Sequence, residues 1–303
     1  MVLRSCIGKN EMSEVEQADV VYACTDSGDL LMRLFRPSTA NGRGIIMVHG
    51  GAWTANDRTT PWVMCEALAA AGMLVASLDF RCGPDFKHPT ASADIAAGVR
   101  YVRMHADELQ VDPNTLGLIG SSSGGHLVLL TALKPDVPEH ATTRVVGTEN
   151  EGAAACSAEV RYVVALWPVS DPPVRYRYAQ ETGRSELVAA HDGYFGSLDQ
   201  MQNASIQRIL RCDEATHLPP AMIVQPGEDA NVPEAMTLDL VTAYQERNGL
   251  LEYRYLPGLP HAFAYQPSKA TDILAVDVLS FIQQQVSGLY THVDLADDGR
   301  VTY

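Results

Sequence analysis

The sequence predicts an α/β fold: a mostly parallel eight-stranded sheet with helices on both faces and an inserted cap. Short apolar runs of strand length alternate along the chain with longer segments of helical periodicity, which is typical of parallel sheets. Two polar segments, at residues 134–160 and 168–218, interrupt this alternation, as functional loops and lids do. We therefore expect a single domain over residues 1–303, with cap insertions at about these two places.

The first elements form a hairpin pattern. Residues 17–24 and 30–36 flank the turn-forming stretch 25–29 and predict two antiparallel strands at one edge of the sheet. Continuous apolar runs, typical of buried parallel strands, follow. They predict strands at residues 44–48, 74–79, 116–119, 162–166, 221–224 and 252–256. Segments of helical pattern lie between and after them, at residues 61–72, 92–108, 125–130, 232–248 and 271–286.

Composition excludes several classes of protein. The chain has 303 residues, 46% hydrophobic, which is enough for one large core. Its net charge of −15 argues against nucleic acid and anionic membranes as partners. The first 17 residues lack the apolar region of a secretory signal, and no stretch approaches the length of a membrane span. Six scattered cysteines without C-x-x-C spacing fit a cytoplasmic location.

The sequence also lacks clusters of residues at metal-ligand spacing and glycine-rich nucleotide-binding patterns. We therefore expect neither a metal nor a cofactor.

The strongest motif is Gly-Ser-Ser-Ser-Gly at residues 120–124, between a predicted strand and a predicted helix. This is the context of a nucleophile elbow, a tight turn that lifts its central serine above the sheet. The pattern predicts Ser122 as a nucleophile. By itself the motif also fits a flexible serine loop, so it needs partners elsewhere in the chain.

An oxyanion loop is predicted upstream, where the strand at residues 44–48 runs into His49-Gly50-Gly51-Ala52-Trp53. Acyl transfer passes through an intermediate bearing a negative oxygen, which preorganised N–H groups stabilise. We expect Gly51, Ala52 and Ser123 to supply these groups, with His49 bracing the loop.

The acid and base are predicted downstream. Asp229 follows the strand at 221–224, and His261 follows the strand at 252–256. The order Ser122, Asp229, His261 is the order in which this kind of sheet carries a serine, an acid and a histidine. For the substrate pocket we select Trp53, Tyr194, Phe195 and His88, and we expect His126 to pack structurally.

These motifs resemble the α/β-hydrolase superfamily over residues 20–288. The likeness is closest to its hormone-sensitive-lipase-like and bacterial carboxylesterase groups, which are related to arylformamidases and feruloyl esterases. The resemblance implies an α/β-hydrolase fold and a carboxylesterase-type serine hydrolase. Such an enzyme would cleave short- to medium-acyl esters of small molecules through an acyl-enzyme intermediate. The chain departs from the pattern at Ala52, where a third glycine is usual. It departs again at Ser121 and Ser123, where Asp and Ala are usual.

Other interpretations stay open from sequence. The His-Gly-Gly-x-Trp loop also fits an amide hydrolase of arylformamidase type. A non-catalytic ligand receptor on the same fold is a further alternative, although such receptors lose a member of the triad. The polar tail at residues 290–303 is interpreted either as a homodimer contact or as a frayed end.

Overall fold

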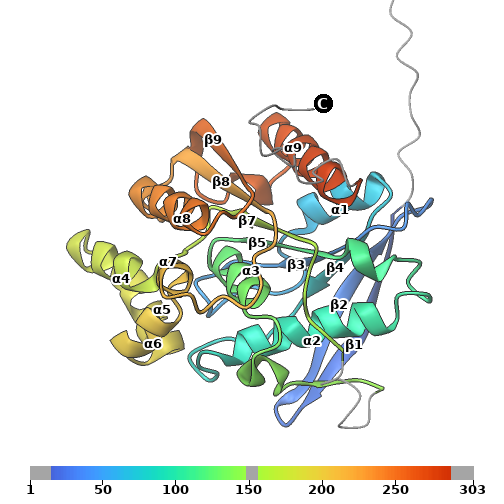
Figure 1. Ribbon diagram of the computed structural model, residues 1–303, viewed down its shortest axis with the longest axis horizontal. Helices are drawn as coiled ribbons and strands as arrows, with labels where there is room; N and C mark the ends of the chain where they lie inside the picture. Colours follow the sequence, from blue (N-terminus) through green and yellow to red (C-terminus); the bar gives the residue numbers. More distant parts are fainter. Residues whose placement is uncertain (1–14, 148–155, 288–303) are drawn as a thin grey trace, which may run out of the picture.

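The computed structural model describes residues 15–147 and 156–287. Within them, nine strands form one sheet in the order β6-β1-β2-β4-β3-β5-β7-β8-β9 (Figure 1). The central pairings, from β4 through β3 and β5 to β9, are parallel. The strands are β1 (Glu16–Thr25), β2 (Gly28–Arg36), β3 (Gly44–Val48), β4 (Leu74–Leu78), β5 (Gly117–Ser121), β6 (Arg144–Val145), β7 (Tyr162–Leu166), β8 (Ala221–Glu228) and β9 (Leu251–Pro260).

The helices cover both faces of the sheet, as predicted (Figure 1). Helices α1 and α9 pack on one face, and α2, α3 and α8 pack on the other. The α-helices are α1 (Trp62–Ala70), α2 (Thr90–Met104), α3 (Ser123–Leu133), α4 (Pro172–Glu181), α5 (Ser185–Phe195), α6 (Leu198–Asn203), α7 (Ile206–Arg211), α8 (Glu234–Glu246) and α9 (Lys269–Val286).

Strand side chains divide between two cores because successive residues point to opposite faces. In β3, Ile45 and Met47 join the core under α1 and α9, whereas Ile46 and Val48 join the core under α2 and α3. All four are at most 1% exposed. Burial on both faces explains why the parallel strands are continuous apolar runs in the sequence.

The predicted count of eight strands is wrong, because β6 adds a ninth. This strand has only two residues and pairs antiparallel with β1, so the predicted hairpin is not at the edge. A strand of two residues is too short to show the alternation of hydrophobic residues from which a strand is predicted. β6 lies within the polar segment 134–160, and this part of the segment extends the sheet. The second segment, 168–218, contains the four helices α4 to α7.

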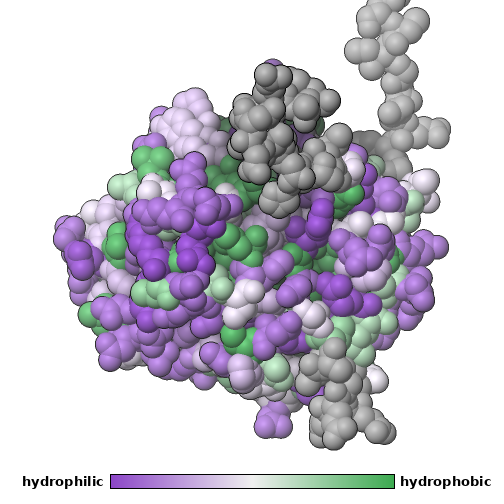
Figure 2. Space-filling view, in the orientation of Figure 1, coloured by the Kyte–Doolittle hydropathy of each residue, from purple (hydrophilic) through white to green (hydrophobic). Residues whose placement is uncertain are grey.

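Hydrophilic residues cover most of the face seen in Figure 2, with hydrophobic ones in small patches between them. Within residues 15–147 and 156–287, no helix is both long enough and apolar enough to cross a bilayer. The tail at residues 290–303, on which the homodimer interpretation depends, lies outside the described part of the chain.

Candidate active site

Ser122 lies in a strained turn between β5 and α3. Its backbone has φ 55° and ψ −119°, which costs on the order of 1–3 kcal/mol for a residue with a side chain. Hydrogen bonds hold the turn: Ser122 N–H donates to the Leu166 carbonyl (2.9 Å), and Val169 N–H donates to the Ser122 carbonyl (3.1 Å). The serine residue is 7% exposed. The predicted elbow conformation is therefore present.

Glycine is required around this turn because backbones approach closely. A Cβ on Gly120 would lie 2.4 Å from the Gly124 carbonyl oxygen. A Cβ on Gly124 would lie 2.3 Å from the carbonyl oxygen of His49. The motif therefore presses the elbow against the end of β3, where the predicted oxyanion loop begins.

The structure brings Ser122, His261 and Asp229 into one hydrogen-bonded chain. His261 Nε2 lies 3.0 Å from Ser122 Oγ, and His261 Nδ1 lies 2.8 Å from Asp229 Oδ2. The Asp229 side chain is fully buried, and its Oδ1 accepts hydrogen bonds from the N–H groups of Asn231 and Val232. These contacts orient the carboxylate toward the imidazole. The arrangement suits proton transfer from a serine hydroxyl to a histidine.

The loop after β3 winds through left-handed backbone conformations. Gly51, Ala52 and Trp53 have φ values of 118°, 51° and 62°. Within residues 15–147 and 156–287, the N–H groups of Gly51 and Ala52 have no hydrogen-bond partner. Ser123 is the first residue of α3, where N–H groups lack intrahelical partners. These three residues are thus able to donate to a developing oxyanion.

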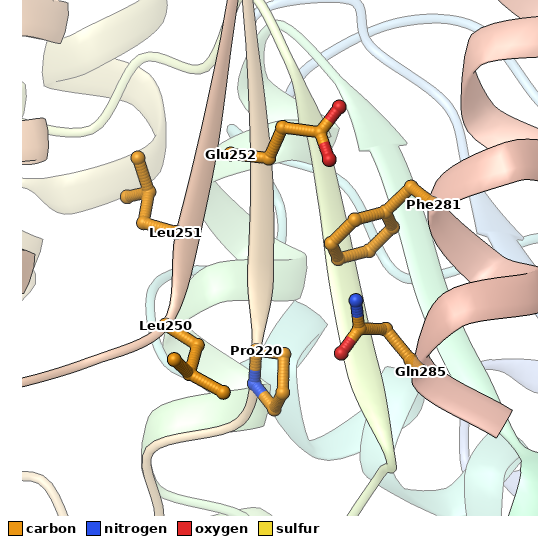
Figure 3. Close-up of a pocket in the computed structure, with 6 residues that line it drawn as sticks. All are labelled: Pro220, Leu250, Leu251, Glu252, Phe281 and Gln285. Atoms are coloured by element: carbon orange, nitrogen blue, oxygen red, sulfur yellow. The ribbon is translucent and has the colours of Figure 1, made fainter. Parts of the chain in front are cut away.

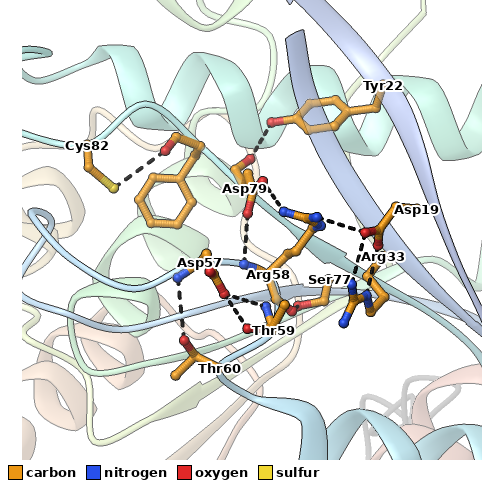
Figure 4. A network of polar contacts seen from close by, with 11 residues as sticks. Asp19, Tyr22, Arg33, Asp57, Arg58, Thr59, Thr60, Ser77, Asp79 and Cys82 are labelled. Atoms are coloured by element: carbon orange, nitrogen blue, oxygen red, sulfur yellow. Dashed lines mark hydrogen bonds and ion pairs between the residues drawn. The ribbon is translucent and has the colours of Figure 1, made fainter.

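Polar contacts hold the same loop at both ends. His49 donates from Nδ1 to the Gly50 carbonyl (2.7 Å) and stacks on Phe80 at 4.2 Å. At the far end, Arg58 pairs with Asp79 after β4 and with Asp19 in β1, each at 2.7 Å (Figure 4). The two ion pairs tie the loop to two strands of the sheet.

Residues of the α4–α5 region form hydrogen bonds with the loop that follows Asp229. Tyr178 donates to the Ala230 carbonyl (2.9 Å), and Arg184 donates to the Asn231 side-chain oxygen (2.7 Å). Arg175 is 2% exposed and donates from Nε to the Asn231 carbonyl (3.1 Å). Burial lowers the pKa of the Arg175 guanidinium to about 10, opposed by the charge of Asp229. Helices α4 and α5 thus fix the backbone beside the acid.

The predicted pocket residues gather around Trp53. Its ring stacks on Tyr194 with a centroid distance of 5.6 Å and meets Phe195 edge-on at 5.0 Å. His88 lies 5.7 Å from Phe195. Trp53, Tyr194 and Phe195 are at most 2% exposed, so this cluster joins the loop to α5 in a closed packing. Their role in holding substrate remains a proposal. His126 is buried and accepts from Trp53 Nε1 (3.3 Å), which is the structural packing predicted for it.

Sequence reasoning missed the residues that support the site. Arg58, Arg175 and Tyr265 carry no motif, and their partners lie far along the chain. Tyr265 bonds to Ser121 across 144 positions. The signal available for Arg58 is Asp79, an acidic residue that directly follows the buried strand β4.

A separate small pocket lies at the opposite edge of the sheet. It has a volume of about 100 Å³ between the amino ends of β8 and β9 and the carboxyl end of α9 (Figure 3). Ser122, Asp229 and His261 all follow the carboxyl ends of parallel strands, where sites of open α/β sheets lie. This pocket therefore does not belong to the candidate active site.

Comparison with known proteins gives a family and a fold. A family model described as BD-FAE matches residues 32–244. The chain is 25% identical over 243 residues to Esterase LipC of Mycobacterium tuberculosis, covering 79% of this chain and 58% of LipC. It is 31% identical over 200 residues to Lipase 2 of a Moraxella species, covering 59% of this chain and 45% of that protein. The chain spans about half the length of these curated relatives.

Among solved structures, a thermophilic esterase of Thermogutta terrifontis with bound propionate aligns with a TM-score of 0.68 at 22% identity. The alignment covers 93% of this chain and 97% of that one. These values confirm the predicted α/β-hydrolase fold.

Proposed function

Because the chain belongs to the BD-FAE family, we propose that it is a serine hydrolase of small carboxylic esters with short to medium acyl groups. The observation that carries the proposal is the hydrogen-bonded chain from Asp229 through His261 to Ser122, at 2.8 and 3.0 Å. The names of its relatives, which include esterases, a lipase and an ethyl acetate hydrolase of Pseudomonas putida, support the same class of substrate.

In the proposed mechanism, Ser122 Oγ attacks the ester carbonyl carbon while His261 Nε2 accepts the hydroxyl proton. Asp229 accepts the Nδ1–H of His261 and stabilises the imidazolium that forms. The N–H groups of Gly51, Ala52 and Ser123 donate to the oxygen that becomes negative. His261 then protonates the leaving alcohol, and water, activated by the same histidine, releases the acid from Ser122.

The test is turnover of p-nitrophenyl acetate and butyrate by the wild-type chain and by Ser122→Ala. We expect Ser122→Ala to lose turnover while keeping the unfolding midpoint. The matched control is Ser92→Ala, which removes a buried hydroxyl on α2 that has no hydrogen-bond partner among residues 15–147 and 156–287. Control activity should stay within about twofold of wild type. Turnover that persists in Ser122→Ala would overturn the assignment of the nucleophile.

The other candidate functions receive less support. The relatives named above are ester hydrolases and a lipase, so cleavage of N-formyl arylamides is not favoured. A ligand receptor is disfavoured because the serine, histidine and acid are all present and in contact. A fluorophosphonate probe distinguishes a hydrolase from a receptor, because only an activated serine becomes labelled. Comparing rates on p-nitrophenyl esters and on N-formylkynurenine distinguishes ester from amide cleavage.

We further propose that Trp53, His88, Tyr194 and Phe195 line the substrate pocket. We also propose that the chain is a single domain with two cap insertions, that it forms a homodimer and that it is cytoplasmic. An ester panel graded by acyl length tests the pocket residues most directly. Substitution of Phe195 by Leu should change the preferred acyl length more than the overall rate, because the change reshapes packing without touching the reacting atoms.

A further inference from the structure

One hydroxyl connects three segments that converge on the candidate site. Tyr265 belongs to a short 3₁₀ helix, Phe263–Tyr265, that follows His261. Its Oη lies 2.6 Å from Ser121 Oγ, in the residue before the proposed nucleophile. The same Oη accepts a hydrogen bond from the N–H of Gly50 (3.1 Å), in the residue before the two proposed oxyanion donors. The segments carrying base, nucleophile and oxyanion loop thus meet at one atom.

The hydrogen bonds assign Gly50 a different role from its neighbours. Its N–H is already bonded to Tyr265, whereas those of Gly51 and Ala52 have no partner among the described residues. Gly50 also packs closely against the elbow and Tyr265. A Cβ added to it would lie 3.2 Å from Ser122 Cβ and 2.7 Å from Tyr265 Oη. A shift of Gly50 would therefore move the two free donors relative to the nucleophile.

Ser121 completes the contact. It is 2% exposed, and its hydroxyl has Tyr265 as its hydrogen-bond partner. Burial raises the pKa of the Tyr265 hydroxyl, so the group stays neutral, and either hydroxyl can donate in this bond. A serine, short and uncharged, allows the phenol to approach both Ser121 and Gly50. The serine before the proposed nucleophile and the tyrosine after the proposed base thus form a hydrogen-bonded pair.

We propose that Tyr265 is a positioning residue that holds the oxyanion loop in register with Ser122, with Ser121 as its partner. This inference rests on the proposed esterase function. Tyr265 touches no reacting atom. Its effect is expected in the transition state, where a displacement of about 1 Å can cost a hundredfold in rate.

The test compares Tyr265→Phe, Ser121→Ala and the double variant on p-nitrophenyl acetate. Tyr265→Phe breaks both bonds and leaves the Gly50 N–H without a partner, so we expect kcat to fall ten- to a hundredfold with KM within about twofold. Ser121→Ala breaks only one bond and should lower kcat about threefold. The double variant should match Tyr265→Phe alone, because the serine acts only through the phenol.

The matched control is Tyr162→Phe, which removes another buried tyrosine hydroxyl. That hydroxyl donates to the Gly44 carbonyl (3.5 Å) at the opposite, amino end of the strands. The control should keep kcat within about twofold of wild type. A fall in kcat equal to that of Tyr265→Phe would show a general effect of lost stability and overturn the proposal. So would additive effects of the Ser121 and Tyr265 substitutions, or a rise in KM with unchanged kcat.

Hydrogen exchange tests the contact without any substrate. In Tyr265→Phe the Gly50 amide should exchange at least tenfold faster than in wild type, whereas Tyr162→Phe leaves it unchanged. Unchanged exchange in Tyr265→Phe would overturn the inference. A wild-type chain that turns over none of the esters would refute the proposed function instead, and exchange would still decide whether Tyr265 holds the loop.

Discussion

Acid should unfold this protein because it buries neutral imidazoles. His126, His140 and His191 are at most 2% exposed. Burial lowers the pKa of each to about 4, against an ordinary value of 6.5. Each ring has a backbone carbonyl partner, those of Ala204, Lys134 and Leu187 respectively. Among the described residues, no acidic side chain forms a hydrogen bond with any of the three rings that would favour its protonated form.

The direction follows from proton binding. Below pH 6.5 the unfolded chain takes up protons at these histidines, whereas the folded chain does not until pH approaches 4, so stability falls with pH across this window. One imidazole with a folded pKa of about 4 loses about 1.8 kcal/mol between pH 7 and pH 5. Three together lose about 5 kcal/mol, a large part of the 5–15 kcal/mol of a typical domain.

The assay is urea unfolding at pH 7 and pH 5, comparing wild type with His140→Gln. His140 is suitable because its ring hydrogen bond, to the Lys134 carbonyl (2.7 Å), can be replaced by a glutamine amide. The variant should lose about 1.8 kcal/mol less than wild type over this interval. Thr142→Ala, an exposed change nearby that keeps the imidazole, should lose as much as wild type.

Equal losses in wild type and His140→Gln would refute the reasoning. So would a wild-type loss under about 1 kcal/mol, because the buried rings would then be protonated in the folded state as well.

Three further predictions concern the turn, the loop and the acid. Gly124→Ala should destabilise the chain by more than about 3 kcal/mol in urea unfolding, since its Cβ meets backbone at 2.3 Å. Gly193→Ala, inside α5 with no contact under 3.5 Å, should instead stabilise it by about 0.5–1 kcal/mol. Arg58→Met should cost about 1–3 kcal/mol by the same assay and lower kcat, because it frees one end of the oxyanion loop. Asp229→Asn should keep the fold by circular dichroism and lower kcat about ten-thousand-fold.

The sequence predicted best the features that depend on residues close together in the chain. The elbow follows from five consecutive residues, because the close approaches at Gly120 and Gly124 admit only glycine. Asp229 and His261 were selected because each follows a predicted strand of a parallel sheet, and the carboxyl ends of such strands lie at one edge. In the structure both residues lie in one hydrogen-bonded chain with Ser122. Strand bounds were less accurate: β9 continues to Pro260 through a register irregularity opposite Pro226, where the turn residues suggested a loop.

The sequence could not predict contacts between residues that lie far apart along the chain. Arg58 meets Asp19 across 39 positions and Tyr265 meets Gly50 across 215, and no period or spacing in the chain encodes such pairs. The pocket residues show the same limit. Trp53 and Phe195 were chosen as aromatic residues near the site, but only three-dimensional packing decides whether an aromatic ring faces substrate or is enclosed by neighbouring helices.

The contacts that hold the candidate site differ in chemistry, so different conditions would weaken each of them. Arg58 holds the far end of the oxyanion loop by ion pairs to carboxylates whose side chains are 24% and 31% exposed, so salt screens them. Tyr265 holds the near end through neutral hydrogen bonds, which screening does not weaken. The loop beside Asp229 depends instead on helices α4 and α5, which lie outside the central sheet. Helix α5 also contacts the oxyanion loop, because Tyr194 and Phe195 pack on Trp53. The α4–α5 region therefore supports two parts of the site at once, the backbone at residues 230–231 beside the acid and the loop after β3.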